Sequence, residues 1–178
     1  RRQRQMCIRD RDVAADAYYA DAVKWAVANG VTSGTSATTF SPNDTCTRAQ
    51  AVTLLYNAAG APAASDTVSF ADVPADSYYA KAVAWAVENG ITNGTSAKTF
   101  SPDATVTRAQ VVTFLWRANG QPAAGNSGFL DVSSNAYYAR AVDWAFANGI
   151  TTGVDYGAFG PDTACTRAQI VTFLYRAR

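Results

Sequence analysis

Histidine is absent from this chain of 178 residues, and Glu88 is its only glutamate. Histidine and paired carboxylates supply most general acid–base catalysis, and histidine is the commonest ligand of catalytic metals. Recurring aspartates such as Asp72 and Asp76 stand at turns and helix starts, where aspartate has an ordinary structural role. We therefore expect no enzymatic activity, no cofactor and no metal site in this chain.

Cysteines and long apolar segments are also scarce. Cys7, Cys46 and Cys165 are the only three cysteines, too few for a zinc-binding set or for the dense disulfide framework of small secreted domains. No apolar run approaches the roughly 18 residues that indicate a membrane-spanning helix. We therefore expect no membrane insertion.

The formal net charge of +1 is unevenly distributed along the chain. Residues 1–11 hold five of the fifteen basic residues and one of the fourteen acidic residues, so residues 12–178 hold ten basic and thirteen acidic residues, a net charge of −3. A mildly acidic body gives no electrostatic basis for nucleic-acid binding, and we expect none.

The basic segment 1–11 could be an arm for an anionic partner, but its sequence "QMCIRDR" resembles translated read-through of a sequencing adapter. The later repeats have Phe70 and Phe129 at the position that Asp10 occupies in this segment. We interpret residues 1–11 as non-native and exclude them from functional reasoning. We also expect the natural protein to have a further exported domain on the N-terminal side.

Most of the chain consists of three copies of one unit, at residues 12–60, 72–120 and 131–178. Each copy contains two helix signals separated by a loop rich in glycine, threonine and proline. Units of about 50 residues bury too little apolar surface to be stable alone, so we expect the repeats to pack together. The fold class is therefore mainly α, with three helix–loop–helix units in one composite domain.

The first helix of each unit carries apolar residues such as Val23 and Ala26 at helical spacing. Its predicted N-caps are Asp16, Asp76 and Asn135, and its predicted ends are Gly30, Gly90 and Gly149. We assign its tryptophans to the core; they are Trp25, Trp85 and Trp144. The tyrosines that open it could be exposed and could give flat faces for sugar rings; they are Tyr18, Tyr78 and Tyr137.

The second helix of each unit follows a threonine–arginine pair. The sequence predicts a capping box, in which the threonine hydroxyl and the glutamine amide exchange hydrogen bonds with each other's backbone. The pairs are Thr47 with Gln50, Thr107 with Gln110, and Thr166 with Gln169. Cys46 and Cys165 precede two of these threonines as small apolar residues, and pairing of the two around a common axis is the alternative. We expect the loop phenylalanines to anchor the loop to the core; they are Phe40, Phe100 and Phe159.

Capping leaves unexplained the arginine that follows each threonine, at Arg48, Arg108 and Arg167. A cation at a helix start is disfavoured by the helix dipole by about 0.3–1 kcal/mol, so a specific partner is expected. One interpretation is an internal salt bridge, for example from Arg48 to Asp44, Asp72 or Asp103. The other is an external carboxylate or phosphate, bound by the guanidinium together with free N–H groups at the helix tip.

The repeats closely resemble the S-layer homology domain. That family begins with F-x-D-V, ends its first helix with N-G-I, has G-T-F-x-P in the loop and places T-R-A-E before the second helix. The second repeat here reads "FADVPADSYYAKAVAWAVENGITNGTSAKTFSPDATVTRAQ". Glutamine replaces the family's usual glutamate in all three copies, and the third loop, "GVDYGAFGP", differs from the other two.

The resemblance implies a pseudo-threefold, three-pronged helical assembly with grooves between adjacent repeats. It also implies an extracellular location at the bacterial cell surface, with non-covalent attachment to a secondary cell-wall polysaccharide that often carries pyruvate ketals. The groove residues that contact the anionic glycan would be Arg48, Arg108 and Arg167. The alternative function is a structural or protein–protein module of surface-layer assembly. We expect Arg108→Ala to weaken wall binding with little change in stability, and one of the three sites to be weak or absent.

Overall fold

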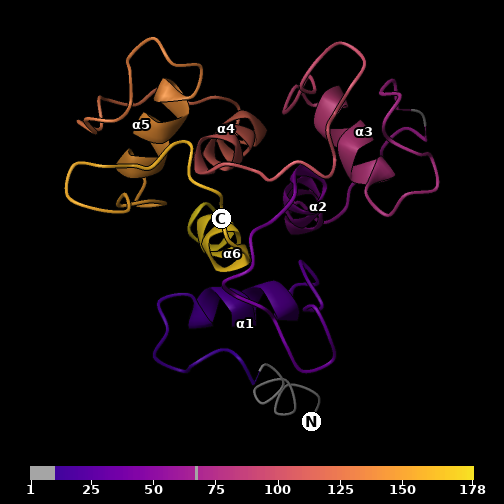
Figure 1. Ribbon diagram of the computed structural model, residues 1–178, viewed down its shortest axis with the longest axis horizontal. Coiled ribbons are helices and arrows are strands. Elements are labelled where there is room, and N and C mark those ends of the chain that lie inside the picture. Colours follow the sequence, from indigo (N-terminus) through magenta and orange to yellow (C-terminus); the bar gives the residue numbers. More distant parts are fainter. Residues whose placement is uncertain (1–10, 67) are drawn as a thin grey trace.

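The computed structural model describes residues 11–66 and 68–178, and within them all the regular structure is helical (Figure 1). The six helices are α1 (Ala20–Ala28), α2 (Arg48–Ala58), α3 (Ala80–Glu88), α4 (Arg108–Ala118), α5 (Ala139–Ala147) and α6 (Arg167–Arg176). Each repeat supplies two helices in the predicted order. The prediction of a mainly α protein built from three helix–loop–helix repeats is confirmed.

The second helices of the three repeats form the centre of the molecule, and the first helices lie around them. Figure 1 shows α2, α4 and α6 close together, with α1, α3 and α5 each in a separate outer lobe. Contacts among α2, α4 and α6 confirm that these three form one bundle. The predicted pseudo-threefold assembly with three prongs is therefore the observed architecture.

Each lobe combines helices from two different repeats. The second helix of one repeat packs against the first helix of the next, in the pairs α2 with α3, α4 with α5, and α6 with α1. Aromatic contacts join two of these pairs, since the ring centroids of Tyr56 and Trp85 lie 5.6 Å apart and those of Trp25 and Tyr175 lie 5.8 Å apart. The third repeat therefore closes back on the first, and no repeat is packed as an independent unit.

A ring of backbone hydrogen bonds surrounds the pseudo-threefold axis just before the central helices. Cys46 N–H donates to Cys165 O at 3.1 Å, Cys165 N–H donates to Val106 O at 2.9 Å, and Val106 N–H donates to Cys46 O at 3.0 Å. The two cysteines are buried and carry free thiols, and they occupy the position that Val106 has in the second repeat. Their interpretation as small buried apolar residues is confirmed, and the alternative of a disulfide is wrong.

The second helices begin as the sequence predicts. In all three, the threonine hydroxyl accepts the N–H of the glutamine three residues later, and the glutamine side chain accepts the threonine N–H. At α2 these bonds measure 3.2 Å from Gln50 N–H to Thr47 Oγ1 and 3.0 Å from Thr47 N–H to Gln50 Oε1. The exchange of glutamate for glutamine therefore leaves the capping box intact.

The first helices begin three residues later than predicted, so the assignment of Asp16, Asp76 and Asn135 as N-caps is wrong. The N-cap residues are Tyr19, Tyr79 and Tyr138, and none makes a side-chain capping bond. The chain enters each helix through isolated turns, as Ala17 N–H bonds Ala14 O and Ala20 N–H bonds Ala17 O. These turns satisfy the early N–H groups locally, which removes the need for a capping side chain.

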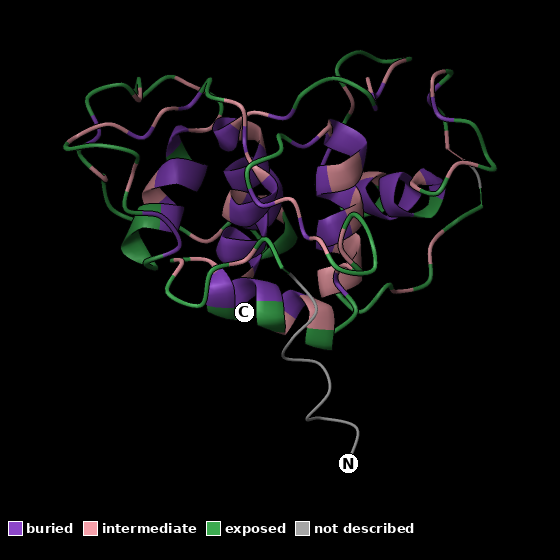
Figure 2. Ribbon diagram, turned by 60° about the horizontal axis from the view of Figure 1, so that its bottom comes forward, coloured by how far each residue is buried: buried purple, intermediate pink, exposed green. Residues whose placement is uncertain are grey.

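The ends of the first helices and the anchored loops match the predictions. Gly30, Gly90 and Gly149 have positive φ angles of 69°, 65° and 66°, which a residue without Cβ adopts without strain. The loop phenylalanines Phe40, Phe100 and Phe159 are fully buried. Figure 2 shows the inward faces of the helices buried and much of the loop surface exposed. Trp85 and Trp144 belong to the core as expected, and Trp25 packs against it half-buried.

The suspected non-native segment 1–11 lies outside the described residues except for its last member. Arg11 N–H donates to Thr38 O at 2.9 Å, as Ala71 N–H does to Lys98 O and Leu130 N–H does to Gly157 O. The backbone at residue 11 thus takes the same place as its counterparts in the other repeats.

Candidate functional site

The three arginines of the repeated motif reach from one repeat into the loop of the next. In each case the Nε–H group donates to the carbonyl of the buried loop phenylalanine. These bonds are Arg48 to Phe100 O at 2.9 Å, Arg108 to Phe159 O at 2.9 Å and Arg167 to Phe40 O at 2.8 Å. The bonds follow one another around the axis, so the arginines connect all three repeats in a closed ring.

An aspartate holds the other side of the same loop phenylalanine. Phe100 N–H and Ser101 N–H donate to the two oxygens of Asp72 at 2.8 and 2.7 Å, and Asp131 and Asp12 hold the other two loops in the same way. Each guanidinium is therefore connected to a carboxylate through one residue, without an ion pair. Among residues 11–66 and 68–178, ion pairs join Lys24 to Asp21 and Lys81 to Asp66 and involve none of these arginines. The alternative of an internal salt bridge from Arg48 to Asp44, Asp72 or Asp103 is therefore wrong.

Two of these loop aspartates have a pKa below its ordinary value of 3.8. Burial acts to raise the pKa of Asp12 and of Asp131, but two backbone N–H groups hydrogen bond each carboxylate and outweigh it. Arg167 adds to the lowering at Asp12, and Arg108 adds to it at Asp131. Both carboxylates are ionised at neutral pH and hold their loops in place.

The three arginines are far more buried than the sequence suggested. The exposed fractions of Arg48, Arg108 and Arg167 are 4%, 2% and 8%, so the expectation of solvent-open side chains is wrong. Arg48 Cζ lies 4.8 Å from the ring centroid of Phe100 and 5.5 Å from that of Phe114. Desolvation lowers the pKa of Arg48 and of Arg108, but arginine starts so far above neutral that both stay charged.

The expectation of free N–H groups at the helix tips is also wrong. At α2, Arg48 N–H donates to Ala104 O at 2.9 Å, Ala49 N–H donates to Pro102 O at 3.0 Å, and Gln50 N–H is capped by Thr47. The same bonds recur at α4 and α6. The loop of the neighbouring repeat crosses each helix tip and occupies the donors, so any anion bound nearby must be held by side chains.

Two grooves nevertheless open beside these arginines. Groove A has a volume of about 320 Å³ and is lined by Arg48, Thr92, Asn93, Gly94, Thr95, Gln110, Thr113, Phe114, Arg117 and Tyr137. Groove B has a volume of about 410 Å³ and is lined by Arg108, Thr151, Thr152, Gly153, Val154, Gln169, Thr172, Phe173, Arg176 and Tyr18. Each groove takes residues from all three repeats, and residues of the same type recur at nearly every equivalent position.

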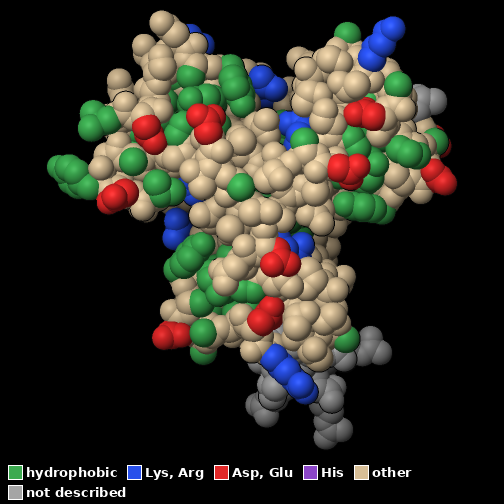
Figure 3. All heavy atoms as spheres, viewed as in Figure 1, with side chains coloured by type: hydrophobic (Ala, Val, Ile, Leu, Met, Phe, Trp, Pro, Cys, Tyr) green, Lys and Arg blue, Asp and Glu red, His purple; other side chains and the backbone are tan. Residues whose placement is uncertain are grey.

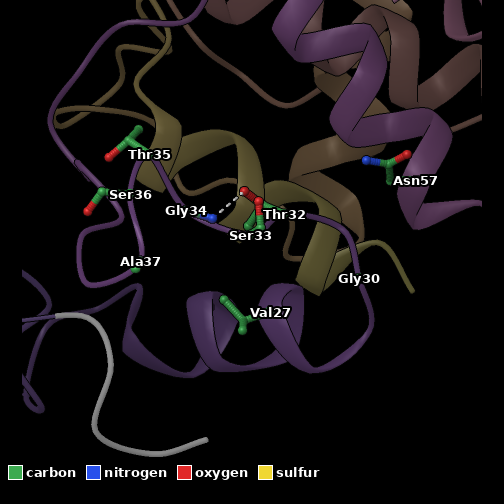
Figure 4. A pocket seen from close by; sticks show the side chains of 9 residues that line it. All are labelled: Val27, Gly30, Thr32, Ser33, Gly34, Thr35, Ser36, Ala37 and Asn57. Atoms are coloured by element: carbon green, nitrogen blue, oxygen red, sulfur yellow. Dashed lines mark hydrogen bonds between the residues drawn. The ribbon is translucent and has the colours of Figure 1, made fainter. Parts of the chain in front are cut away.

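The third equivalent position is a hollow of about 670 Å³ with a different set of lining residues, which we call the third hollow. Its lining consists of Val27, Gly30, Thr32, Ser33, Gly34, Thr35, Ser36, Ala37 and Asn57 (Figure 4). Arg167 Nη2 lies 3.5 Å from Thr32 Oγ1, yet Arg167 and Tyr78 are not among the lining residues. The third hollow therefore presents small and hydroxyl-bearing residues in place of an arginine.

The tyrosines proposed as sugar platforms are exposed. The exposed fractions of Tyr18, Tyr78 and Tyr137 are 63%, 67% and 61%, and each ring lies edge-on to the tyrosine that follows it, with centroids 5.0 Å apart. The structure places Tyr137 in groove A and Tyr18 in groove B. Tyr78 is exposed but lies outside the lining of the third hollow.

Sequence reasoning missed a second arginine in each of the two grooves. Arg117 Nη1 donates to Ile91 O at 3.0 Å in groove A, and Arg176 Nη1 donates to Ile150 O at 3.2 Å in groove B. Asn57 stands at the corresponding position of the first repeat. The aligned segments "LLYNAAG", "FLWRANG" and "FLYRAR" carry this signal, since a charge present in two copies is lost in the third.

The space-filling view agrees with cationic recesses between lobes. Figure 3 shows several Lys and Arg side chains in the recesses between the lobes and others at the outer ends of the lobes, while most acidic side chains lie on the lobes themselves. Within residues 11–66 and 68–178, no group of three His, Cys, Asp or Glu side chains is placed to hold a metal ion. Across the same residues, none of the helices has the length and apolar character needed to span a bilayer.

Comparison with known proteins gives three matches to one family along the chain. Residues 9–52, 69–112 and 128–171 match the S-layer homology domain. The matched segments follow the three repeats and include Arg48, Arg108 and Arg167.

The similar curated proteins are much longer than this chain. It is 34% identical over 164 residues to a Surface-layer 125 kDa protein of Lysinibacillus sphaericus, covering 89% of this chain and 14% of that protein. It is 36% identical over 117 residues to a Cell surface protein of Thermoanaerobacter kivui, covering 62% and 15%. It is 34% identical over 147 residues to an Endoglucanase of Bacillus sp. (strain KSM-635), covering 78% and 15%. The chain thus spans about one seventh of the length of these three relatives.

Proposed function

Because the chain belongs to the S-layer homology family of non-catalytic surface-anchoring modules, we propose that its inter-repeat grooves bind an anionic polysaccharide of the bacterial cell wall. The ligand would be a secondary cell-wall polymer with carboxylate substituents such as pyruvate ketals. The protein that contains the module would thereby be held at the outer surface of the cell.

One observation carries this proposal: each of grooves A and B contains two arginines that form no ion pair with any described carboxylate. A guanidinium group offers several N–H donors in a planar fork that matches a carboxylate. Arg48 and Arg108 line the grooves with the Nε donor bound to a loop carbonyl, and Arg108 Nη2 also donates to Thr151 Oγ1 at 3.4 Å. The cations are therefore fixed in position before any ligand arrives, which reduces the entropy lost on binding.

The remaining groove residues suit a carbohydrate rather than a flat or apolar ligand. Groove A offers the exposed hydroxyl of Thr95 and the exposed amide of Asn93, both of which can hydrogen bond sugar hydroxyls. Tyr137 adds an exposed aromatic face at the groove edge. Groove B offers the exposed hydroxyl of Thr152 and the exposed ring of Tyr18.

A repeating polymer would gain from the presence of more than one groove. Binding of one sugar residue holds the next within reach of the second groove, so the second contact forms at a high effective concentration. Two weak grooves on one rigid body can then retain a surface protein without a covalent bond.

The test is co-sedimentation of the chain with purified cell walls. We expect binding that saturates, weakens with salt and falls strongly when the walls are stripped of the anionic polymer or of its pyruvyl groups. The double variant Arg117→Asn/Arg176→Asn should bind at least tenfold more weakly, and Arg140→Ala, an exposed arginine outside the grooves, is the control. Equal sedimentation with intact and stripped walls would contradict the proposal. Assembly into sheets without wall binding would instead favour the structural or protein–protein alternative.

A further inference from the structure

We propose that the three inter-repeat sites are of two kinds: grooves A and B each take one carboxylate-bearing sugar residue, whereas the third hollow takes none. The residue at position 57, 117 or 176 decides between the two kinds. This inference rests on the proposed function and specifies which ligand chemistry each site accepts.

These three positions are structurally equivalent. Each lies in the last turn of its central helix and donates a hydrogen bond to the first residue after the glycine that ends the outer helix of the same repeat. The bonds are Asn57 Nδ2 to Val31 O at 3.1 Å, Arg117 Nη1 to Ile91 O at 3.0 Å and Arg176 Nη1 to Ile150 O at 3.2 Å. Asparagine and arginine therefore perform the same structural task at this position.

The charge of Arg117 and Arg176 is not needed for that task. Asn57 makes the bond with a neutral amide, so the fold requires only a donor. Within the described part of the chain, Arg117 donates to Ile91 O and to no other acceptor, and Arg176 likewise donates to Ile150 O alone. Each guanidinium keeps unused donors beside its groove, which a bound carboxylate can accept.

The groove tyrosines report the same difference in local charge. Burial raises the pKa of all three tyrosines, and the tyrosine that follows each one raises it further. Arg48 and Arg117 lower the pKa of Tyr137, and Arg108 and Arg176 lower that of Tyr18. No arginine lowers the pKa of Tyr78. The surroundings of Tyr78 therefore lack the paired cations that the other two tyrosines face.

The third hollow lacks the arginine pair of the other two sites. Asn57 takes the place of one arginine, and Arg167, whose Nη2 lies 3.5 Å from Thr32 Oγ1, is not among the residues that line the hollow. What remains is a neutral wall of serine, threonine and glycine. A carboxylate entering this hollow would give up water without meeting a pair of arginines, which makes its binding weaker there than in groove A or B.

One backbone amide in each site allows the three to be observed separately. Gly34, Gly94 and Gly153 each lie in one site and donate the N–H group to the threonine two residues earlier, at 3.1, 3.2 and 3.1 Å. The experiment is an amide nitrogen–proton NMR titration of the chain with a methyl hexopyranoside that carries a 4,6-linked pyruvate ketal. Its uncharged methyl ester is the ligand control.

We expect the Gly94 and Gly153 signals to shift and saturate, with Gly34 responding at least tenfold more weakly, if at all. The ester should shift none of the three at the same concentration. Asn57→Arg should give Gly34 a saturable response, and Arg117→Asn should weaken the Gly94 response about 10–100-fold while leaving Gly153 unchanged. Arg176→Asn is the matched variant for groove B, and all other amide signals report whether each variant is folded.

Equal dissociation constants at the three glycines would overturn this inference, as would a Gly34 response that is the same with and without Asn57→Arg. If no glycine responds although the chain sediments with intact walls and not with stripped walls, the inference fails and the proposed function stands. If the chain also sediments equally with both kinds of wall, the proposed function fails as well.

Discussion

Replacing Arg108 by alanine should destabilise the whole protein, not only weaken ligand binding. Arg108 is 2% exposed and joins the second repeat to the loop of the third through Phe159 O. Its Cζ lies 4.8 Å from the ring centroid of Phe159 and 5.3 Å from that of Phe173. The earlier expectation of nearly unchanged stability assumed an open side chain, and the observed burial replaces it.

The size of the effect follows from the contacts that alanine removes. A hydrogen bond from a charged donor to a buried carbonyl contributes about 1.5–3 kcal/mol. Two cation–ring contacts add about 0.5–2 kcal/mol. Removing a desolvated charge returns part of this energy, because the folded state no longer keeps a cation away from water. We therefore expect a loss of about 2–4 kcal/mol in the free energy of unfolding.

Thermal and chemical denaturation measure this loss directly. For a protein of this length, each kcal/mol lowers the melting temperature by about 2–4 °C, so Arg108→Ala should melt about 5–15 °C below the wild type. Arg108→Lys keeps a charge but loses the planar fork, and it should fall between the two. Arg140→Ala removes an exposed arginine of α5 and should change the free energy of unfolding by less than about 0.5 kcal/mol.

A melting temperature for Arg108→Ala within about 2 °C of the wild type would refute this reasoning. It would mean that the bond to Phe159 and the ring contacts do not hold the repeats together. The loss of stability also affects the interpretation of binding experiments, since weaker wall binding by Arg108→Ala can result from unfolding of the protein. Arg117→Asn is the better probe of binding, because asparagine can keep the bond to Ile91 as Asn57 does to Val31.

Two further predictions concern titratable groups. Asp131 has a folded-state pKa below 3.8, so its contribution to stability should be complete above about pH 5 and lost as the pH falls below about 4. Asp131→Asn should therefore lower stability at pH 7 and flatten the acid limb of a plot of unfolding free energy against pH, and an unchanged acid limb would contradict the assignment. Burial raises the pKa of Cys46 to about 11 and that of Cys165 to about 12, so in a Cys7→Ser variant neither thiol should react promptly with Ellman's reagent at pH 8. Two thiols should react once denaturant is added, and rapid reaction of the native protein would count against the buried positions.

The features that sequence reasoning predicted correctly are local in the chain. A capping box needs residues three apart, and a helix-ending glycine needs only its own φ angle, so Thr47 with Gln50 and the glycine at Gly30 could be identified without tertiary structure. The burial of Phe40 followed from its place in a repeated loop. The three-copy pattern then fixed the number and order of the helices.

The features that were missed depend on residues far apart in sequence. Arg48 is buried because the loop at Phe100, 52 positions away, lies across the start of α2, and nothing within the first repeat indicates this. The same loop occupies the N–H groups of Arg48 and Ala49, which local reasoning left free for a ligand. Because each repeat packs against the next one, the sequence of a single repeat does not predict these contacts.

The second groove arginine was missed for a different reason. Arg117 and Arg176 lie at the C-terminal ends of their helices, where the helix dipole favours a basic residue. The dipole alone therefore accounted for both arginines, and no role in a groove was considered. Only the structure shows that both face the grooves of Arg48 and Arg108. Comparing the three copies with one another, position by position, would have identified Asn57 as the exception.

The pairing of α1 with α6 constrains how the polypeptide matures. A ribosome releases α1 first, but the helix that covers its apolar side emerges only when the third repeat is complete. Until then the nascent chain exposes the surface around Val23 and Ala26, which is buried in the finished protein. During translation, the lobe that contains α1 should therefore stay incompletely packed until α6 has been made. Nascent chains that end before α6 should remain sensitive to protease.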